Sequence, residues 1–287
     1  MIPTFAQSFS YRINRRSQSY HAGDHRGVQS GVGLEFRDNV PLVDYPDARR
    51  IAISQSIQDP SEQVYVRVFN QKNPASVYAV CDLSGSMRFE GTRSKTALAA
   101  EIAASIAYSA SLANDRFAFL GFDRTVRNDW AVPLSRKMHE AFSLIQKLHT
   151  YHAPQANAEG LLDVGRYLGK SRGLVFLISD FHLPLPTLER ALNSLSRHQI
   201  VPIVLWDSGE YRRLPAFGLG DIVDPETGEQ RTLFFRPDLR RKFESLFQAR
   251  REQLKALFMR YEMPPFFVED SFAADALSKY FYQFSTL

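Results

Sequence analysis

Alternating oxygen-bearing side chains in one short segment are the first sign of chemistry in this sequence. The segment is DLSGSM at residues 82–87, in which Asp82, Ser84 and Ser86 occupy every second position. A carboxylate and two hydroxyls are hard oxygen ligands, which Mg²⁺ prefers in proteins. Because the hydroxyls carry no charge, a metal held there stays electron-poor and can accept a further acidic ligand. The segment therefore predicts a divalent-metal site with an open coordination position.

A second carboxylate, Asp180 in the segment LISDFHLP, stands at the end of a later apolar run. In an open parallel α/β sheet, ligands bind outside the carboxyl ends of the strands. We expect Asp82 and Asp180 to meet at that edge. Together with the two serines they can form a shallow Mg²⁺ cup completed by water. A second interpretation is that the side chains at 82–86 only cap the next helix and shape the turn.

The elements that must position these side chains follow from the alternation of apolar and polar runs. Short apolar runs predict strands at residues 76–81, 116–122, 173–179 and 200–206, with a short edge strand at 126–132. Helical patterns lie at residues 94–113, 135–148, 158–168 and 186–197. Strands alternating with helices predict an α/β fold, a mainly parallel sheet with helices on both faces. Pro202 places the start of the last strand near Ile203, or at the edge of the sheet.

The flanking segments predict additions to this central domain. Residues 1–30 are polar and predicted to be irregular, and residues 64–69 alternate like a strand. The C-terminal patterns predict a hairpin within 218–235 around the turn DPETGE, an amphipathic helix at 238–261, a strand at 266–268 and a helix at 271–284. We therefore expect three parts, namely residues 1–74 as an N-terminal extension packing on the core, 75–210 as the central domain, and 211–287 as a hairpin and helices completing it.

Composition and charge narrow the class of protein. Of 287 residues, 44% are hydrophobic, and no apolar run approaches the roughly 18 residues of a membrane-spanning helix. The N-terminus lacks the residue order of a signal peptide, and the single cysteine, Cys81, excludes an internal disulfide. The 35 basic and 31 acidic residues leave a net charge of +4, too small to indicate nucleic-acid binding. We therefore expect a cytoplasmic protein that neither binds nucleic acid nor inserts into a membrane.

Two levels of resemblance to known proteins rest on these segments. The pattern Asp-x-Ser-x-Ser after the first buried strand, with an Asp after a later one, resembles the metal-ion-dependent adhesion site (MIDAS) of von Willebrand factor A domains. The order of strands and helices over residues 76–206 also resembles the Rossmann-like fold of those domains. The stretches GLEFRD at 33–38 and DYPDARRI at 44–51 are similar to a bacterial family of uncharacterised proteins. So are the DPETGE hairpin and the basic helix after it. That family is typically encoded beside MoxR-type AAA+ ATPases, and its members include a soluble type in methanol dehydrogenase maturation clusters.

The resemblance implies roles for individual residues. Ser84 and Ser86 would bind the metal directly, whereas Asp82 and Asp180 would act directly or through water. The family pattern also has a threonine on a middle loop, but here the loop YHAPQANA at 151–158 has none at the expected place.

Several further side chains complete the predicted site. On the middle loop an amide oxygen of Gln155 or Asn157 could replace the missing hydroxyl. We expect Met87, His152 and His182 to contact a partner at the rim. An alternative is a transition-metal site made of His149, His152 and His182.

Two functions of different classes follow. The first is a non-enzymatic binding module, in which Mg²⁺ or Mn²⁺ presents its open position to a Glu or Asp of a partner. The resemblance implies that this partner is a MoxR-like AAA+ ATPase or its client, in a chaperone-like role that matures a client protein or inserts a metal or cofactor.

The second is a metal-dependent hydrolase of the phosphatase type. An aspartyl nucleophile would need a second Asp two residues on, where this chain has Ser84. The motifs GxxxxGK[ST] and GxSxG are also absent from the sequence. We therefore expect a binding protein and not an enzyme.

Overall fold

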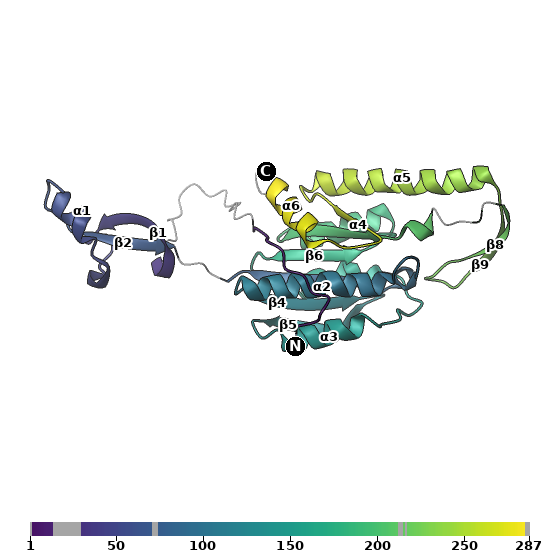
Figure 1. Cartoon of the computed structure of the whole chain (residues 1–287), viewed down its shortest axis with the longest axis horizontal. Coiled ribbons are helices and arrows are strands. Elements are labelled where there is room, and N and C mark those ends of the chain that lie inside the picture. Colours follow the sequence, from purple (N-terminus) through teal and green to yellow (C-terminus); the bar gives the residue numbers. More distant parts are fainter. Residues whose placement is uncertain (1, 14–29, 71–73, 212–214, 216, 285–287) are drawn as a thin grey trace. The chain divides into compact units, whose positions relative to one another are not determined.

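The chain folds into two compact units in the computed structural model (Figure 1), which describes residues 2–13, 30–70, 74–211, 215 and 217–284. The small unit spans Arg16–Pro74, and the main unit combines Met1–Arg15 with Ala75–Leu287. Residues 2–13 thus belong with the central domain and not with the small unit, although the sequence patterns group them with residues 30–70.

The small unit is built on one antiparallel strand pair. Strand β1 (Ser30–Pro41) pairs with β2 (Tyr65–Asn70), where a strand is predicted, and Val66 and Val68 are buried. A 3-10 helix, η1 (Ala48–Arg50), and the short helix α1 (Ile53–Gln58) lie between the two strands in the chain.

The main unit confirms the predicted α/β fold with a mainly parallel sheet. Its six strands have the order β10-β7-β6-β3-β4-β5, and all pairs are parallel except β4 with β5. The strands are β3 (Ser76–Asp82), β4 (Arg116–Phe122), β5 (Val126–Ser135), β6 (Leu174–Ser179), β7 (Gln199–Trp206) and β10 (Phe266–Glu269). Every residue of β3 and β6 is buried, because helices cover both faces.

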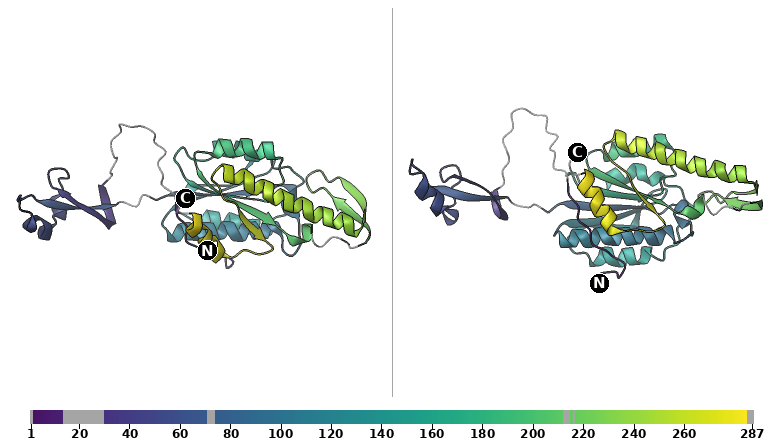
Figure 2. Two further views of the ribbon diagram at one scale, coloured as in Figure 1. Left: turned by 90° about the horizontal axis from the view of Figure 1, so that it is seen from above. Right: turned by 45° about the horizontal axis from the view of Figure 1, so that its top comes forward.

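Helices form a layer on each face of the sheet (Figures 1 and 2). One core contains residues of α2 (Lys95–Leu112), α3 (His139–Leu148) and α6 (Ala274–Phe284). The other contains residues of η3 (Glu159–Arg166), α4 (Leu185–Leu195) and α5 (Pro237–Arg260). The alanines of α2 keep that helix close to the sheet, since they are almost all fully buried.

Two local details differ from the predictions. The helix predicted at residues 158–168 is present as a 3-10 helix over Glu159–Arg166, in which Gly160 is held tightly against the β4–β5 turn and donates its N–H to the carbonyl of Asp123. Strand β7 begins at Gln199 and not near Ile203, so Pro202 lies inside it. Pro202 pairs in register with Leu177 of β6, whereas β10 pairs with β7 only from Ile203 onward.

The C-terminal elements follow the predicted order. Strands β8 (Gly218–Val223) and β9 (Gln230–Phe235) form an antiparallel hairpin that pairs with neither of the other sheets. Figure 1 shows this hairpin beyond the end of the sheet where the parallel strands terminate. The apolar stripe of α5 is fully buried only in its second half, since Leu254 and Phe258 are buried while Phe247 is half-buried and Leu246 is 55% exposed. No helix within the described ranges combines the length and apolar character that crossing a membrane requires.

Residues 2–13 are irregular, as predicted, but they are anchored to the main unit. The backbone N–H of Phe9 donates to Ser109 Oγ at 2.9 Å, and its ring packs against Phe176 and Phe281. The segment therefore contributes an aromatic side chain to the core rather than lying loosely on the surface.

We predict that Phe9→Ala destabilises the main unit by about 3 kcal/mol, because truncating a buried aromatic ring leaves a cavity in the core. The measurement is the free energy of unfolding in denaturant, with Ser8→Ala on the exposed side of the segment as control. A loss no larger than that of Ser8→Ala would contradict the anchoring role.

Candidate metal centre

The ends of two neighbouring strands place the predicted ligands at one edge of the sheet. Strands β3 and β6 are adjacent and parallel, so Asp82 at the end of β3 and Asp180 just after β6 emerge together. Ser179 links them, because its hydroxyl donates to Asp82 Oδ2 at 2.6 Å. Both carboxylates are almost completely buried.

The turn after β3 holds the two serine hydroxyls side by side. Asp82 Oδ1 accepts the backbone N–H of Ser84 at 2.9 Å, and Ser84 Oγ lies 3.2 Å from Ser86 Oγ. Ser84 is the N-cap of the short 3-10 helix η2 (Gly85–Arg88), yet its side chain makes no capping hydrogen bond. Turn formation therefore accounts for Asp82, whereas capping does not account for the serines.

A buried lysine from the next helix enters the site. Lys95, in the first turn of α2, places Nζ at 3.0 Å from Asp180 Oδ2, 2.5 Å from Glu210 Oε1 and 3.5 Å from the carbonyl of Ser86. Burial alone lowers the pKa of Lys95, but the carboxylates of Asp180 and Glu210 outweigh burial and raise it. Lys95 is therefore a fixed cation in the site.

Sequence reasoning missed Lys95 and Glu210. The available signals were a lysine opening an otherwise small and apolar helix, and a glutamate shortly after the strand at 199–206.

The two aspartates differ in their electrostatic state. Burial, followed by repulsion from Asp180, raises the pKa of Asp82 to about 7. For Asp180, burial works in the same direction, but the charges of Lys95 and His182 outweigh it and lower the pKa to about 2. Asp180 is thus charged at neutral pH, while Asp82 is poised to exchange its proton for a metal ion.

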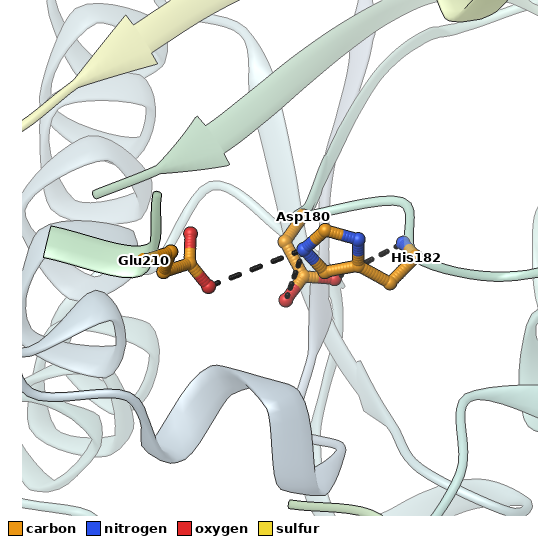
Figure 3. A group of neighbouring side chains, drawn as sticks. All are labelled: Asp180, His182 and Glu210. Carbon is orange, nitrogen blue, oxygen red and sulfur yellow. Dashed lines mark hydrogen bonds and ion pairs between the residues drawn. The ribbon is translucent and has the colours of Figure 1, made fainter. Parts of the chain in front are cut away.

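A second group of ligand atoms lies beside the cup. One ligand atom each from Asp180, His182 and Glu210 lie within 4.8 Å of one another (Figure 3). His182 Nε2 is 4.0 Å from both Asp180 Oδ2 and Glu210 Oε1. Because the Lys95 ammonium already binds these two oxygens, a metal could enter this group only by displacing Lys95.

The loop after Asp180 is fixed by helix α5. The Arg250 guanidinium donates to the carbonyl of Phe181 at 2.6 Å and also to that of Leu183. Phe181 has a φ of 53°, a backbone conformation that a non-glycine residue rarely adopts without such support. Arg250 interrupts the apolar stripe of α5 because it holds this loop.

The middle loop reaches the site through its main chain. The carbonyl of Ala156 accepts the N–H of Gly85 at 2.7 Å. Asn157 is half-buried, and its Oδ1 accepts the N–H of Glu159 at 3.4 Å. Gln155 is exposed, and its amide lies against Gly228 of the hairpin. Asn157 Oδ1 is therefore engaged within its own loop, while the Gln155 amide lies beside the hairpin.

The predicted partner contacts divide into three environments. The prediction for Met87 is wrong, because its side chain is fully buried in the core beneath the turn. His152 is exposed, and His182 is also exposed but stacks parallel to Trp206. The three-histidine site is also wrong. His149 stacks on Phe5, and His182 is the one histidine in the metal-ligand group found among the described residues, where it lies with Asp180 and Glu210.

We predict that Lys95→Met destabilises the protein by about 3–5 kcal/mol, because it leaves Asp180 and Glu210 buried without their cation. Arg166→Met is the control. It removes an ion pair to Asp163 in which the arginine side chain is 81% exposed and the aspartate side chain 45% exposed, so we expect a loss under about 1 kcal/mol. Equal losses in denaturant unfolding would show that Lys95 contributes no more than a surface pair.

The raised pKa of Asp82 predicts a pH dependence of stability. The pKa of Asp82 is 3.8 in the unfolded chain and about 7 in the folded protein. Between about pH 4 and 7 the folded state therefore keeps a proton that the unfolded state has lost, so the free energy of unfolding falls as the pH rises through this window. Asp82→Asn removes this dependence. In thermal unfolding with chelator, we therefore expect the melting temperature of Asp82→Asn minus that of wild type to increase as the pH rises from about 4 to 7. A difference that does not change with pH would contradict the assignment.

Comparison with known proteins places the chain among uncharacterised sequences. The profile of the family described as "Protein of unknown function DUF58" matches residues 51–253. An "Uncharacterized protein in moxR 3'region" of Paracoccus denitrificans is 33% identical over 98 residues, which are 34% of this chain and 93% of that protein.

Two solved structures are similar at low identity. The conserved hypothetical protein BatB from Bacteroides thetaiotaomicron is 13% identical with a TM-score of 0.45, covering 74% of this chain and 100% of that one. An aerotolerance-related membrane protein from Bacteroides fragilis NCTC 9343 is 12% identical with a TM-score of 0.44, covering 74% of this chain and 98% of that one. Neither likeness is strong enough to bear on the site.

Proposed function

This chain belongs to the DUF58 family of proteins of unknown function, and from that membership and the strand-end site we propose that it is a non-enzymatic binding module. A divalent cation, Mg²⁺ or Mn²⁺, binds in a cup of the MIDAS type formed by Asp82, Ser84, Ser86 and Asp180. The cation presents an open position to a carboxylate of a partner protein.

The observation that carries the proposal is the pair of buried serine hydroxyls beside two buried carboxylates. Ser84 Oγ and Ser86 Oγ lie 3.2 Å apart and are not used as helix caps. Hydroxyl and carboxylate oxygens suit Mg²⁺ or Mn²⁺ better than softer metals. The serines would bind the ion directly, and the aspartates would bind it directly or through water.

The charge of the site favours a further cation. Asp82, Asp180 and Glu210 are all largely buried, and Lys95 is the fixed cation that contacts the last two. Asp180 uses Oδ2 for Lys95, its Oδ1 accepts the long 3.3 Å bond from the N–H of His182, and its carboxylate also accepts a hydrogen bond from the Ser86 side chain. A divalent ion on the serine side would compensate Asp82 without displacing the lysine.

The partner we propose is a MoxR-type AAA+ ATPase or a client of that ATPase. The support is the curated relative named for the moxR 3' region, which matches this chain at 33% identity. In this function the pair acts as a chaperone-like device that matures a client protein or inserts a metal or cofactor. The two serines hydrogen-bond to each other rather than to a histidine, so they are arranged as ligands and not as activated nucleophiles.

We predict that the full chain binds Mg²⁺ and Mn²⁺ in calorimetric titration and that Ser84→Ala with Ser86→Ala abolishes the binding. A ligand present at 100 times its Kd stabilises the folded state by about 2.7 kcal/mol, so the melting temperature of wild type should rise with either metal. Ser111→Ala, on the exposed end of α2, is the control.

Two results would overturn the proposal. One is the absence of heat and of a melting-temperature change in wild type with both metals. The other is unaltered binding in the double variant, which would place any metal elsewhere, such as at Asp180, His182 and Glu210.

A further inference from the structure

The tip of the β8–β9 hairpin lies directly on the turn that carries the two serines. A Cβ atom added to Gly85 would fall 2.1 Å from the carbonyl oxygen of Pro225 and 3.1 Å from the Cα of Glu226. On its other side the tip meets the middle loop, since a Cβ on Gly228 would lie 3.0 Å from Nε2 of Gln155. The hairpin therefore closes over the cup between the turn and the middle loop.

The tip is shaped to hold one carboxylate at this position. Asp224 Oδ1 accepts the N–H groups of Glu226 at 2.8 Å and of Thr227 at 3.3 Å. The N–H of Gly228, at a φ of 75°, donates to the carbonyl of Asp224 at 2.8 Å. This tight turn leaves Glu226 half-buried, while its neighbours Pro225 and Thr227 are exposed.

The charges that act on Glu226 from the described part of the chain are acidic. Burial, followed by repulsion from Asp180, Asp224 and Glu159, raises the pKa of its carboxyl. A carboxylate held among carboxylates is unfavourable unless a cation lies between them. The tip geometry places Glu226 at the serine turn, and its charge would be compensated by a cation bound there.

We propose that Glu226 is an acidic ligand that the chain itself supplies to the open position of the cation, so that a partner must displace the hairpin tip to bind. This inference rests on the proposed function, because it requires the ion in the cup. It adds that a segment of the same chain covers the site. The bound cation would hold the hairpin tip in place, because the Glu226 carboxylate, otherwise repelled by the nearby acidic groups, would become a ligand of the cation.

The hairpin is built so that it can swing away. One face of β8 is exposed, since Leu219 is 74% and Val223 is 53% exposed, and among the described strands β8 and β9 pair only with each other. Gly218, at the start of β8, has a φ of 118° and nothing near its Cβ position, which suits a hinge. Displacing the tip breaks the contacts at Gly85 and Gln155 and leaves the hairpin pairing intact.

The test compares Glu226→Gln with Glu229→Gln, a matched change in the same turn at an exposed residue paired with Arg231. We expect Glu226→Gln to weaken Mn²⁺ binding by about tenfold or more, and Glu229→Gln to leave it unchanged. In hydrogen–deuterium exchange, Mn²⁺ should slow exchange of the amides at 224–229 in wild type and in Glu229→Gln. In Glu226→Gln, a Mn²⁺ concentration that saturates the variant should not slow the exchange of these amides.

The outcomes separate this inference from the proposed function. Mn²⁺ binding by wild type, with equal affinity and equal protection of the tip in Glu226→Gln, would overturn the role of Glu226 and leave the cup intact. Wild type that binds no Mn²⁺ would overturn both. Loss of affinity and of tip protection in Glu226→Gln alone would establish the internal ligand.

Discussion

Burial of two aspartates at the ends of adjacent parallel strands is the constraint on which the rest of this structure depends. Asp82 and Asp180 are each about 1% exposed, and two carboxylates so close cannot both remain charged without a compensating cation. Lys95 compensates Asp180, with Glu210 as its second partner. Asp82 has only hydrogen bonds from Ser179 and Ser84, and so it retains a proton near neutral pH or requires a second cation.

The surrounding elements can be understood as supports for this charge arrangement. The alanines of α2 let that helix lie close enough to the sheet for Lys95 to reach the strand ends. Arg250 of α5 holds the backbone that follows Asp180. The hairpin between β7 and α5 then lays its tip over Gly85. Elements from three separate parts of the sequence therefore fix a site whose ligands come from two strand ends.

Local patterns predicted most of the fold, because strands buried on both faces are continuous apolar runs and the helices between them are periodic. They predicted a helix at 158–168 but not its 3-10 form or the close approach of Gly160 to the β4–β5 turn, which is a tertiary contact. The juxtaposition of Asp82 and Asp180 could be predicted because strand ends meet at one edge of a parallel sheet, and the structure brings them together there.

The parts of the site that were missed depend on packing between elements. Lys95 reaches the cup from a helix, and Glu210 reaches it from a loop. The spacing of residues in the sequence does not indicate where that helix and that loop lie relative to the strand ends. Met87 was misplaced for a related reason. It follows a polar motif in the chain, but the turn of η2 directs its side chain into the core. In the same way, the DPETGE turn was predicted as a hairpin, but only the fold shows that it covers the serine turn.

The most direct test of the central claim is the anomalous difference density of a crystal of the full chain soaked in Mn²⁺. Our account predicts one peak at about 2.1 Å from Ser84 Oγ and Ser86 Oγ, the distance typical of Mg²⁺–oxygen coordination, with Lys95 still bound to Asp180 and Glu210. A peak bound by His182, Glu210 and Asp180 with Lys95 displaced would contradict it. So would the absence of any peak at the serines when Mn²⁺ is in excess.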